Sequence, residues 1–236
     1  MSKIYILNQK MNLQYQEIEE YIKNLNQIKT KDQIILAPTT LYLDYCKKNT
    51  KYEICAQNAY YEDQGAYTGE VSFRQLKSLN INYAIIGHSE RRNIFDENNK
   101  IINQKLIACL KNKIIPVLCT GESKEERNNN NHLFKIENQI KTSLADTNPE
   151  YIIIAYEPIW SIGTKTIPTE LELSEMINHI YKIMKTNYHC AFKILYGGSV
   201  DENNIKNILK INHIDGVLIG SSSLKMDKIT KIVNNQ

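Results

Sequence analysis

The sequence predicts an α/β protein that folds as a single (β/α)8 barrel over residues 1–236, and three observations favour this fold. Short apolar runs recur eight times along the chain. Most are followed by a polar or glycine-bearing turn and then by apolar residues at helical spacing. Two-residue hairpin signals are absent between the runs, which favours parallel strands joined by helices over antiparallel hairpins.

Each apolar run has the length and the composition of a buried parallel strand. Such strands are covered on both faces, so their residues are apolar throughout and do not alternate with polar ones. The run at 151–156, Tyr-Ile-Ile-Ile-Ala-Tyr, is the clearest example. In order, the predicted strands are residues 4–7, 34–37, 52–57, 83–86, 114–119, 151–156, 192–196 and 216–219.

Helical patterns fill the segments between these runs. The clearest are 101–109 and 173–184, where apolar residues recur every three or four positions. Ser174 and Asp201 are expected in the first turns or caps of such helices. The asparagine-rich tract at 128–131 is expected to be a solvated loop.

An open, doubly wound sheet is the alternative architecture. A glycine fingerprint for a dinucleotide would follow its first strand, and residues 8–15 contain no glycine. The chain is slightly shorter than the roughly 250 residues typical of the barrel. The closed barrel is therefore the prediction.

Composition excludes several classes of protein. The net charge is +3, and the lysines are scattered rather than gathered into a stripe, so nucleic acid is not an expected partner. No apolar stretch approaches the ~20 residues of a membrane span, and the N-terminus does not resemble a signal peptide. Five cysteines without disulfide or zinc spacing indicate reduced thiols. We therefore expect a cytoplasmic protein without membrane association.

Polar side chains gather where the predicted strands end, which is the catalytic face of a barrel. Asn8 and Lys10 follow the first strand, His88 the fourth and Glu157 the sixth. Glu157 is a candidate base, because a closing loop can desolvate it. The less favoured alternative for Glu157 is a solvated carboxylate at a strand end, and Lys10 could be a plain surface lysine.

His88 is expected at the start of a helix, because Ser89 and Glu90 follow it. A helix N-terminus disfavours imidazolium, so His88 should be neutral and able to donate a hydrogen bond to a developing oxyanion. No second ligand lies at metal spacing, so neither a metal nor another cofactor is expected. Cys119 is interpreted as a packing residue rather than a nucleophile.

Two turns of small residues follow the last two strands. They are Gly197-Gly198-Ser199 and Gly220-Ser221. Such turns expose backbone N–H groups, and in barrels this position commonly holds phosphate. Each turn alone could be a tight connection, but the pair favours an anion site.

Taken together, these motifs resemble the triosephosphate isomerase family over essentially the whole chain. The E-P-x-W and Y-G-G-S-V motifs are specific, whereas N-x-K alone would not be. The matching segments are N-x-K at 8–10, A-Q-N at 56–58, G-A-Y-T-G-E-V-S at 65–72, G-H-S-E-R-R at 87–92, C-T-G-E at 119–122, A-Y-E-P-I-W-S-I-G-T at 155–164, Y-G-G-S-V at 196–200 and D-G-V-L-I-G at 215–220.

The resemblance implies a TIM barrel that interconverts glyceraldehyde 3-phosphate and dihydroxyacetone phosphate through an enediolate. It implies that Glu157 moves the proton between carbons, that His88 polarises the carbonyl and shuttles protons, and that Lys10 stabilises negative charge while Asn8 orients the site. Loop 158–168 would close as a lid. Backbone N–H groups would hold the phosphate at Gly163, Ser199, Gly220 and Ser221.

The resemblance also implies a homodimer. The loop 65–71 would insert into the partner and bring Thr68 near the partner's Lys10 and His88. Glu70 and Arg91 would form an ion pair across the interface, and Glu90 would lie near Lys10 of its own chain. Alternatively, this loop projects from the surface without contacting a partner.

Three positions depart from the family's pattern. Gln9 stands where the family usually has tryptophan, Lys165 where glycine is common, and Ser221 where a second glycine is common. Pro168 in the lid hinge Thr166-Ile167-Pro168 has no N–H to donate to Tyr196. These changes affect packing and lid contacts rather than the chemistry.

Two other functions remain open from the residues alone. A sugar-phosphate epimerase or aldolase would need a metal cluster or a Schiff-base lysine at a strand end, and neither is evident. A barrel kept only for binding or adhesion would have no need of Lys10, His88 and Glu157 together.

Overall fold

The computed structural model describes residues 2–164 and 166–234, which form a closed barrel of eight parallel strands. The strands follow one another around the barrel in chain order, and β8 pairs with β1 to close it. The predicted fold class is confirmed. The strands are β1 Ile4–Asn8, β2 Gln33–Ala37, β3 Glu53–Ala56, β4 Tyr83–Ile86, β5 Ile115–Thr120, β6 Tyr151–Tyr156, β7 Ala191–Tyr196 and β8 Gly216–Ile219.

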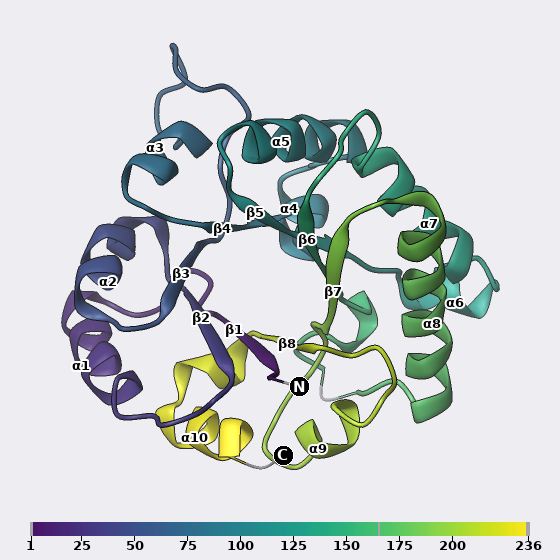
Figure 1. The fold of residues 1–236 in the computed structure, drawn as a ribbon. Helices are drawn as coiled ribbons and strands as arrows, with labels where there is room; N and C mark the ends of the chain where they lie inside the picture. The colour runs from purple at the N-terminus through teal and green to yellow at the C-terminus, as the bar shows by residue number, and fades with distance from the viewer. Residues whose placement is uncertain (1, 165, 235–236) are drawn as a thin grey trace.

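Helices surround the strands as an outer ring (Figure 1). The described residues also form three short 3-10 helices, η1 Thr40–Tyr42, η2 Ile159–Ser161 and η3 Ser221–Leu224. The α-helices are α1 Tyr15–Leu25, α2 Leu43–Asn49, α3 Phe73–Ser78, α4 Ser89–Ile94, α5 Asn99–Lys111, α6 Lys124–Asn128, α7 His132–Ser143, α8 Glu170–Asn187, α9 Ile205–Ile208 and α10 Met226–Asn234.

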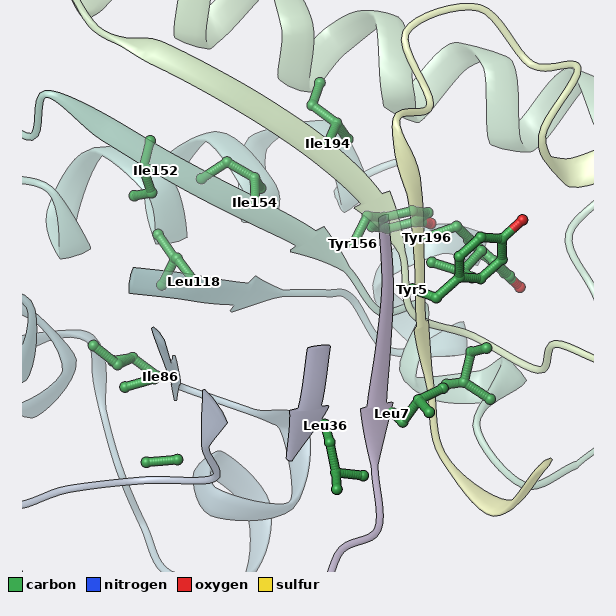
Figure 2. Packing of buried hydrophobic residues seen from close by; sticks show 14 of the residues in the cluster. Tyr5, Leu7, Leu36, Ile86, Leu118, Ile152, Ile154, Tyr156, Ile194 and Tyr196 are labelled. Carbon is green, nitrogen blue, oxygen red and sulfur yellow. The ribbon is translucent and has the colours of Figure 1, made fainter. Parts of the chain in front are cut away.

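The strands are apolar on both faces because they separate two cores. Residues such as Ile6, Val117 and Ile153 point into the barrel and form one cluster of buried side chains. Their neighbours along the same strands point outward and pack against the helices in a second, larger cluster. Figure 2 shows part of this outer cluster, including Tyr5 and Tyr156. Burial on both faces explains why the strand sequences do not alternate.

Capping residues set the starts of several helices. Ser72, Ser123 and Thr169 each accept a hydrogen bond from the N–H group three residues later and form capping boxes. The expected role of Ser174 is wrong, because Thr169 caps α8 and Ser174 lies in its second turn. Asp201 accepts hydrogen bonds from two N–H groups in the turn that leads into α9.

Two loops bear on the sequence predictions. The asparagine-rich tract starts at Asn128, the last residue of α6, and continues as the connection to α7. The loop between β3 and α3 projects beyond the ring of helices (Figure 1), and residues 64–70 of it are exposed. Among the described residues, no helix is both long enough and apolar enough to cross a bilayer.

Candidate active site

One cavity of about 220 Å³ opens among the carboxyl ends of the strands. It contains every residue that the sequence assigns to catalysis or to phosphate binding, although these residues come from five separate segments of the chain. The predicted residues that line it are Asn8, Lys10, His88, Glu157, Gly163, Ser199, Gly220 and Ser221.

Glu157 is held by the barrel itself. Its N–H donates to the carbonyl of Thr120, which extends the pairing of β5 with β6 by one residue. The carboxylate is 2% exposed. Its Oε2 accepts a hydrogen bond of 3.0 Å from the N–H of Ser89, and its Oε1 lies 3.2 Å from Nε2 of His88. The carboxylate is therefore shielded from solvent and hydrogen-bonded, although it lines the cavity.

Two glycines make room for Glu157. A Cβ at Gly121 would lie 1.8 Å from the carbonyl oxygen of Glu157, and a Cβ at Gly197 would lie 2.8 Å from its Cγ. Neither approach is possible for a residue with a side chain. The C-T-G-E and Y-G-G-S motifs therefore supply space for Glu157 as well as polar groups.

Replacing Gly121 by alanine is expected to destabilise the fold by about 3 kcal/mol or more, because backbone must move to relieve the contact. Gly163→Ala is the control, since a Cβ there meets nothing within 4 Å and only its φ of +70° is strained. We expect that variant to lose about 1–2 kcal/mol. Urea unfolding measures both changes. Equal losses would contradict the packing argument.

His88 caps helix α4. Its Nδ1 accepts a hydrogen bond of 3.2 Å from the N–H of Glu90, so Nδ1 carries no proton in this arrangement. The Glu90 carboxylate is 3.6 Å from Nδ1, which is too long for a hydrogen bond. The remaining ring proton is therefore on Nε2, the atom that faces Glu157 and the cavity.

Lys10 has a left-handed backbone, with a φ of +53°. This conformation is uncommon for a residue with a side chain and needs support. Asn8 Oδ1 accepts the Lys10 N–H at 3.1 Å, and Gln57 Nε2 donates to the Lys10 carbonyl at 2.8 Å. The ammonium group pairs with Glu90 at 2.5 Å. Asn8 thus orients Lys10, and Glu90 lies beside it as expected.

The turn after β8 is the more open of the two small-residue turns. Gly220 caps η3, whose first residue is Ser221, and the leading N–H groups of a helix have no partner within it. A Cβ at Gly220 would lie 3.3 Å from Cε of Lys10. The Lys10 side chain and the N–H groups at the start of η3 therefore lie at one end of the cavity.

The turn after β7 is tied to the lid segment. The N–H of Ser199 donates to Ser161 Oγ at 3.3 Å, and Ser199 Oγ donates to the Ser161 carbonyl at 2.5 Å. Ser161 Oγ also lies 3.1 Å from the hydroxyl of Tyr196 and donates to the carbonyl of Thr166 at 2.6 Å. Pro168 has no N–H to donate to the Tyr196 hydroxyl, and Ser161 Oγ is the partner of this hydroxyl instead. Lys165 lies outside the described residues.

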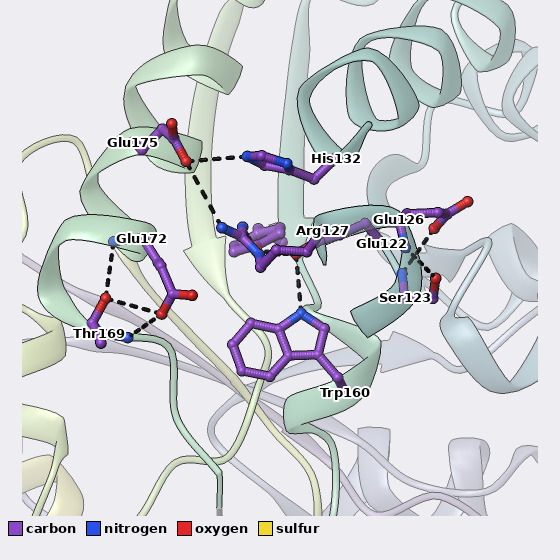
Figure 3. A network of polar contacts seen from close by, with 10 residues as sticks. Glu122, Ser123, Glu126, Arg127, His132, Trp160, Thr169, Glu172 and Glu175 are labelled. Atoms are coloured by element: carbon purple, nitrogen blue, oxygen red, sulfur yellow. Dashed lines mark hydrogen bonds and ion pairs between the residues drawn. The ribbon is translucent and has the colours of Figure 1, made fainter. Parts of the chain in front are cut away.

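A buried polar network anchors the start of the lid (Figure 3). Glu122 is fully buried, and its Oε1 accepts hydrogen bonds from Trp160, Tyr156 and Arg127. The Arg127 and Lys124 side chains also lie over the Trp160 ring. Trp160, in the first turn of the lid, is therefore fixed to Glu122 in the loop after β5 and to two side chains of α6.

A second cavity of about 400 Å³ adjoins the first and shares Asn8, Lys10 and His88 with it. The residues predicted for a dimer interface lie around it or near it. Thr68 and Glu70 are exposed on the projecting loop. Arg91 is paired with Glu97 of its own chain.

The remaining candidate groups take no part in this site. Burial raises the pKa of the Cys119 thiol well above its usual range, as expected for a packing residue. His132 is paired with Glu175, and His179 contacts the carbonyl of Leu133. Within residues 2–164 and 166–234, no cluster of three or more histidine, cysteine or acidic side chains could hold a metal ion.

Several contributors were not identified from the sequence. Three hydrogen bonds to site residues come from segments distant in the chain. They are the bond from the Ser89 N–H to Glu157, the bond from the Gln57 amide to the Lys10 carbonyl, and the bond from the Ser199 N–H to the Ser161 hydroxyl. Gln57 lies in the A-Q-N motif, which could have pointed to it. Ser161 lies in the A-Y-E-P-I-W-S-I-G-T motif, but the motif does not reveal which residue it contacts.

A closed barrel whose mouth brings a dry carboxylate against an imidazole N–H, beside an ammonium group, defines an enzyme that moves protons on an anionic substrate. Comparison with known proteins is more specific. Residues 3–236 match the family model described as triosephosphate isomerase. The chain belongs to the triosephosphate isomerase family, and it is an isomerase.

Relatives of the same name match along almost their whole length. The triosephosphate isomerase of Thermodesulfovibrio yellowstonii is 42% identical, with 98% of this chain and 98% of the relative covered. That of Mesomycoplasma hyorhinis is 40% identical over 99% and 98%. That of Aquifex aeolicus is 38% identical over 99% of both.

Proposed function

We propose that this protein interconverts D-glyceraldehyde 3-phosphate and dihydroxyacetone phosphate, a step of glycolysis and gluconeogenesis, by proton transfer through an enediolate. The observation that carries the proposal is the facing pair of Glu157 Oε1 and His88 Nε2, 3.2 Å apart in a buried cavity. One group accepts a proton and the other can donate one. An aldose–ketose exchange needs both.

The carboxylate of Glu157 removes the proton from the carbon next to the carbonyl and returns it to the neighbouring carbon. The His88 N–H donates a hydrogen bond to the carbonyl oxygen, where negative charge develops. The same imidazole then moves a proton between the two oxygens. Lys10 stabilises the anion. To reach the substrate carbon, Glu157 has to give up the hydrogen bond from Ser89.

Backbone N–H groups of Gly163, Ser199, Gly220 and Ser221 hold the phosphate, with the Lys10 ammonium group close by. The position of Gly220 beside Lys10 Cε supports this assignment. The lid, residues 158–168, closes over the substrate and excludes water from the enediolate. No cofactor is required, because the reaction moves only protons.

An assay of the purified protein that couples triose phosphate isomerisation to a dehydrogenase tests the proposal. We expect turnover with either triose phosphate and competitive inhibition by phosphoglycolate, which mimics the enediolate in charge and shape. Turnover that requires an added metal, or a protein that binds phosphoglycolate without turnover, would contradict it.

We also propose that the protein is a cytoplasmic homodimer in which each barrel is one domain spanning residues 1–236. The projecting loop fits the kind of cavity that adjoins the active site, and exposed Met11 and Phe95 line that cavity. The partner's Thr68 would then approach Lys10 and His88, and the partner's Glu70 would approach Arg91.

Phe95→Glu is expected to dissociate the dimer, because it places a charge in a desolvated interface. Phe134→Glu is the matched control: Phe134 on α7 is 68% exposed against 59% for Phe95, but it lies away from this cavity. Sedimentation velocity should give the mass of one chain for the first variant and of two for the second. A fully active monomeric wild type would remove the role of Thr68.

A further inference from the structure

A small buried polar cluster lies behind the turn that follows β8. Tyr21 from α1, Gln9 from the segment after β1 and Ser223 from η3 are each at least nine-tenths buried. The Tyr21 hydroxyl donates a hydrogen bond of 2.7 Å to the Ser223 carbonyl. Ser223 Oγ donates to the carbonyl of Asn8 at 3.1 Å. The outer helix α1, the end of β1 and the turn are thus connected.

Ser223 also closes the turn itself. Its N–H donates to the carbonyl of Gly220 at 2.8 Å, so a shift of Ser223 displaces Gly220 and Ser221 as well. The positions of Gly220 and Ser221, the two residues proposed to face the phosphate, therefore depend on the position of Ser223. The end of β1 that Ser223 contacts also carries Lys10. The cluster sets the distance between the cation and the turn.

Gln9 is the unusual member of this cluster. It is 1% exposed, lines the active-site cavity, and its amide nitrogen makes no hydrogen bond of normal length to any described residue. A buried amide without a partner is uncommon. Gln9 acts on the Tyr21 phenol, where it opposes the rise in the pKa that burial causes.

Burial raises the pKa of Tyr21 well above its usual range, so the phenol stays protonated and remains a donor. Its ring is already packed into the outer core. The ring could therefore stabilise the fold without the hydroxyl. What the hydroxyl adds is a directed bond to the turn.

We propose that Tyr21 is a positioning residue for phosphate binding, because its hydroxyl holds Ser223 and thereby fixes the Gly220–Ser221 turn at its working distance from Lys10. This inference rests on the proposed function, in which that turn binds the phosphate of the substrate. Tyr21 touches no substrate atom and acts only through Ser223.

The test compares two tyrosine-to-phenylalanine variants. Tyr21→Phe removes the hydroxyl behind the turn. Tyr52→Phe is the matched control, because the Tyr52 hydroxyl also donates at 2.7 Å to a backbone carbonyl, that of Ile28, at the opposite end of the barrel. Each variant loses one phenol-to-carbonyl bond, so similar drops in the unfolding midpoint are expected.

The two variants are expected to differ only in measurements that involve a phosphate group. For Tyr21→Phe we expect kcat/KM for glyceraldehyde 3-phosphate to fall about 3- to 10-fold, mainly through KM, as suits one lost hydrogen bond. The kcat/KM for unphosphorylated glyceraldehyde should not change. The dissociation constant of inorganic phosphate, from calorimetry, should rise by a similar factor. Tyr52→Phe should match the wild type in all three.

Equal losses on both substrates, or wild-type phosphate affinity in Tyr21→Phe, would overturn the inference. The calorimetric measurement does not depend on turnover. A wild type that binds phosphate but does not isomerise triose phosphates would remove the proposed reaction, and a weaker phosphate affinity of Tyr21→Phe would still support the role of Tyr21.

Discussion

Glu157→Asp is expected to lower kcat by about 10²-fold or more, with only a modest change in KM. The shorter side chain withdraws the carboxylate by one methylene from a position fixed by the pairing of β6 with β5. Misplacement of a reacting group by about 1 Å costs on this scale. Apart from Gly163, the groups proposed for phosphate lie on other segments, so substrate affinity should change little. Steady-state kinetics in both directions measure the effect.

Glu150→Asp provides the matched control. Glu150 is exposed and immediately precedes β6, at the opposite end of the same strand. It should behave as wild type. Near-normal turnover of Glu157→Asp would reject Glu157 as the base, whatever the result for the control.

His88→Gln is expected to lower kcat by about 10²- to 10⁴-fold, the contribution typical of a positioned general acid. A glutamine amide can donate a hydrogen bond, but it cannot take up and release a proton between two oxygens. The enediolate should therefore live longer and exchange more with solvent. In D₂O, proton NMR should detect more deuterium at the substrate carbon per turnover than with the wild type.

His189→Gln serves as the control for this change, because His189 is exposed in the loop before β7, away from the cavity. It should leave both kcat and deuterium incorporation unaltered. Full activity of His88→Gln, with unaltered incorporation, would take histidine out of the mechanism.

The barrel could be predicted because its strands are buried on both faces. That requirement gives continuous apolar runs such as 151–156, and three predicted strands have the same bounds in the structure. The others differ by one residue at one or both ends, where polar residues such as Asn8 and Thr120 still pair with the neighbouring strand. The cap of α8 was misplaced because Thr169 and Ser174 are both suitable residues, and only the capping box distinguishes them.

That the candidate residues lie around one cavity could also be predicted, because a parallel barrel brings all strand ends to one face. Asn8, His88 and Glu157 line one cavity for that reason. The contacts that hold these groups could not be predicted. The hydrogen bond from Gln57 to Lys10 joins residues 47 positions apart, and the one from Tyr21 to Ser223 joins residues 202 positions apart. No local sequence pattern encodes contacts between residues so far apart in the chain.

The bonds between Ser161 and Ser199 bear on how this site treats small anions. An incoming anion that uses the Ser199 N–H must first displace Ser161 Oγ, an internal competitor for the same donor. The net affinity is reduced by about 0.5–1.5 kcal/mol, the value of one such bond. A full substrate recovers this loss through its carbon skeleton, whereas free phosphate or sulfate cannot. Weak binding of inorganic phosphate and sulfate is therefore the expected consequence of the proposed phosphate site, because these anions have no carbon skeleton to offset the penalty.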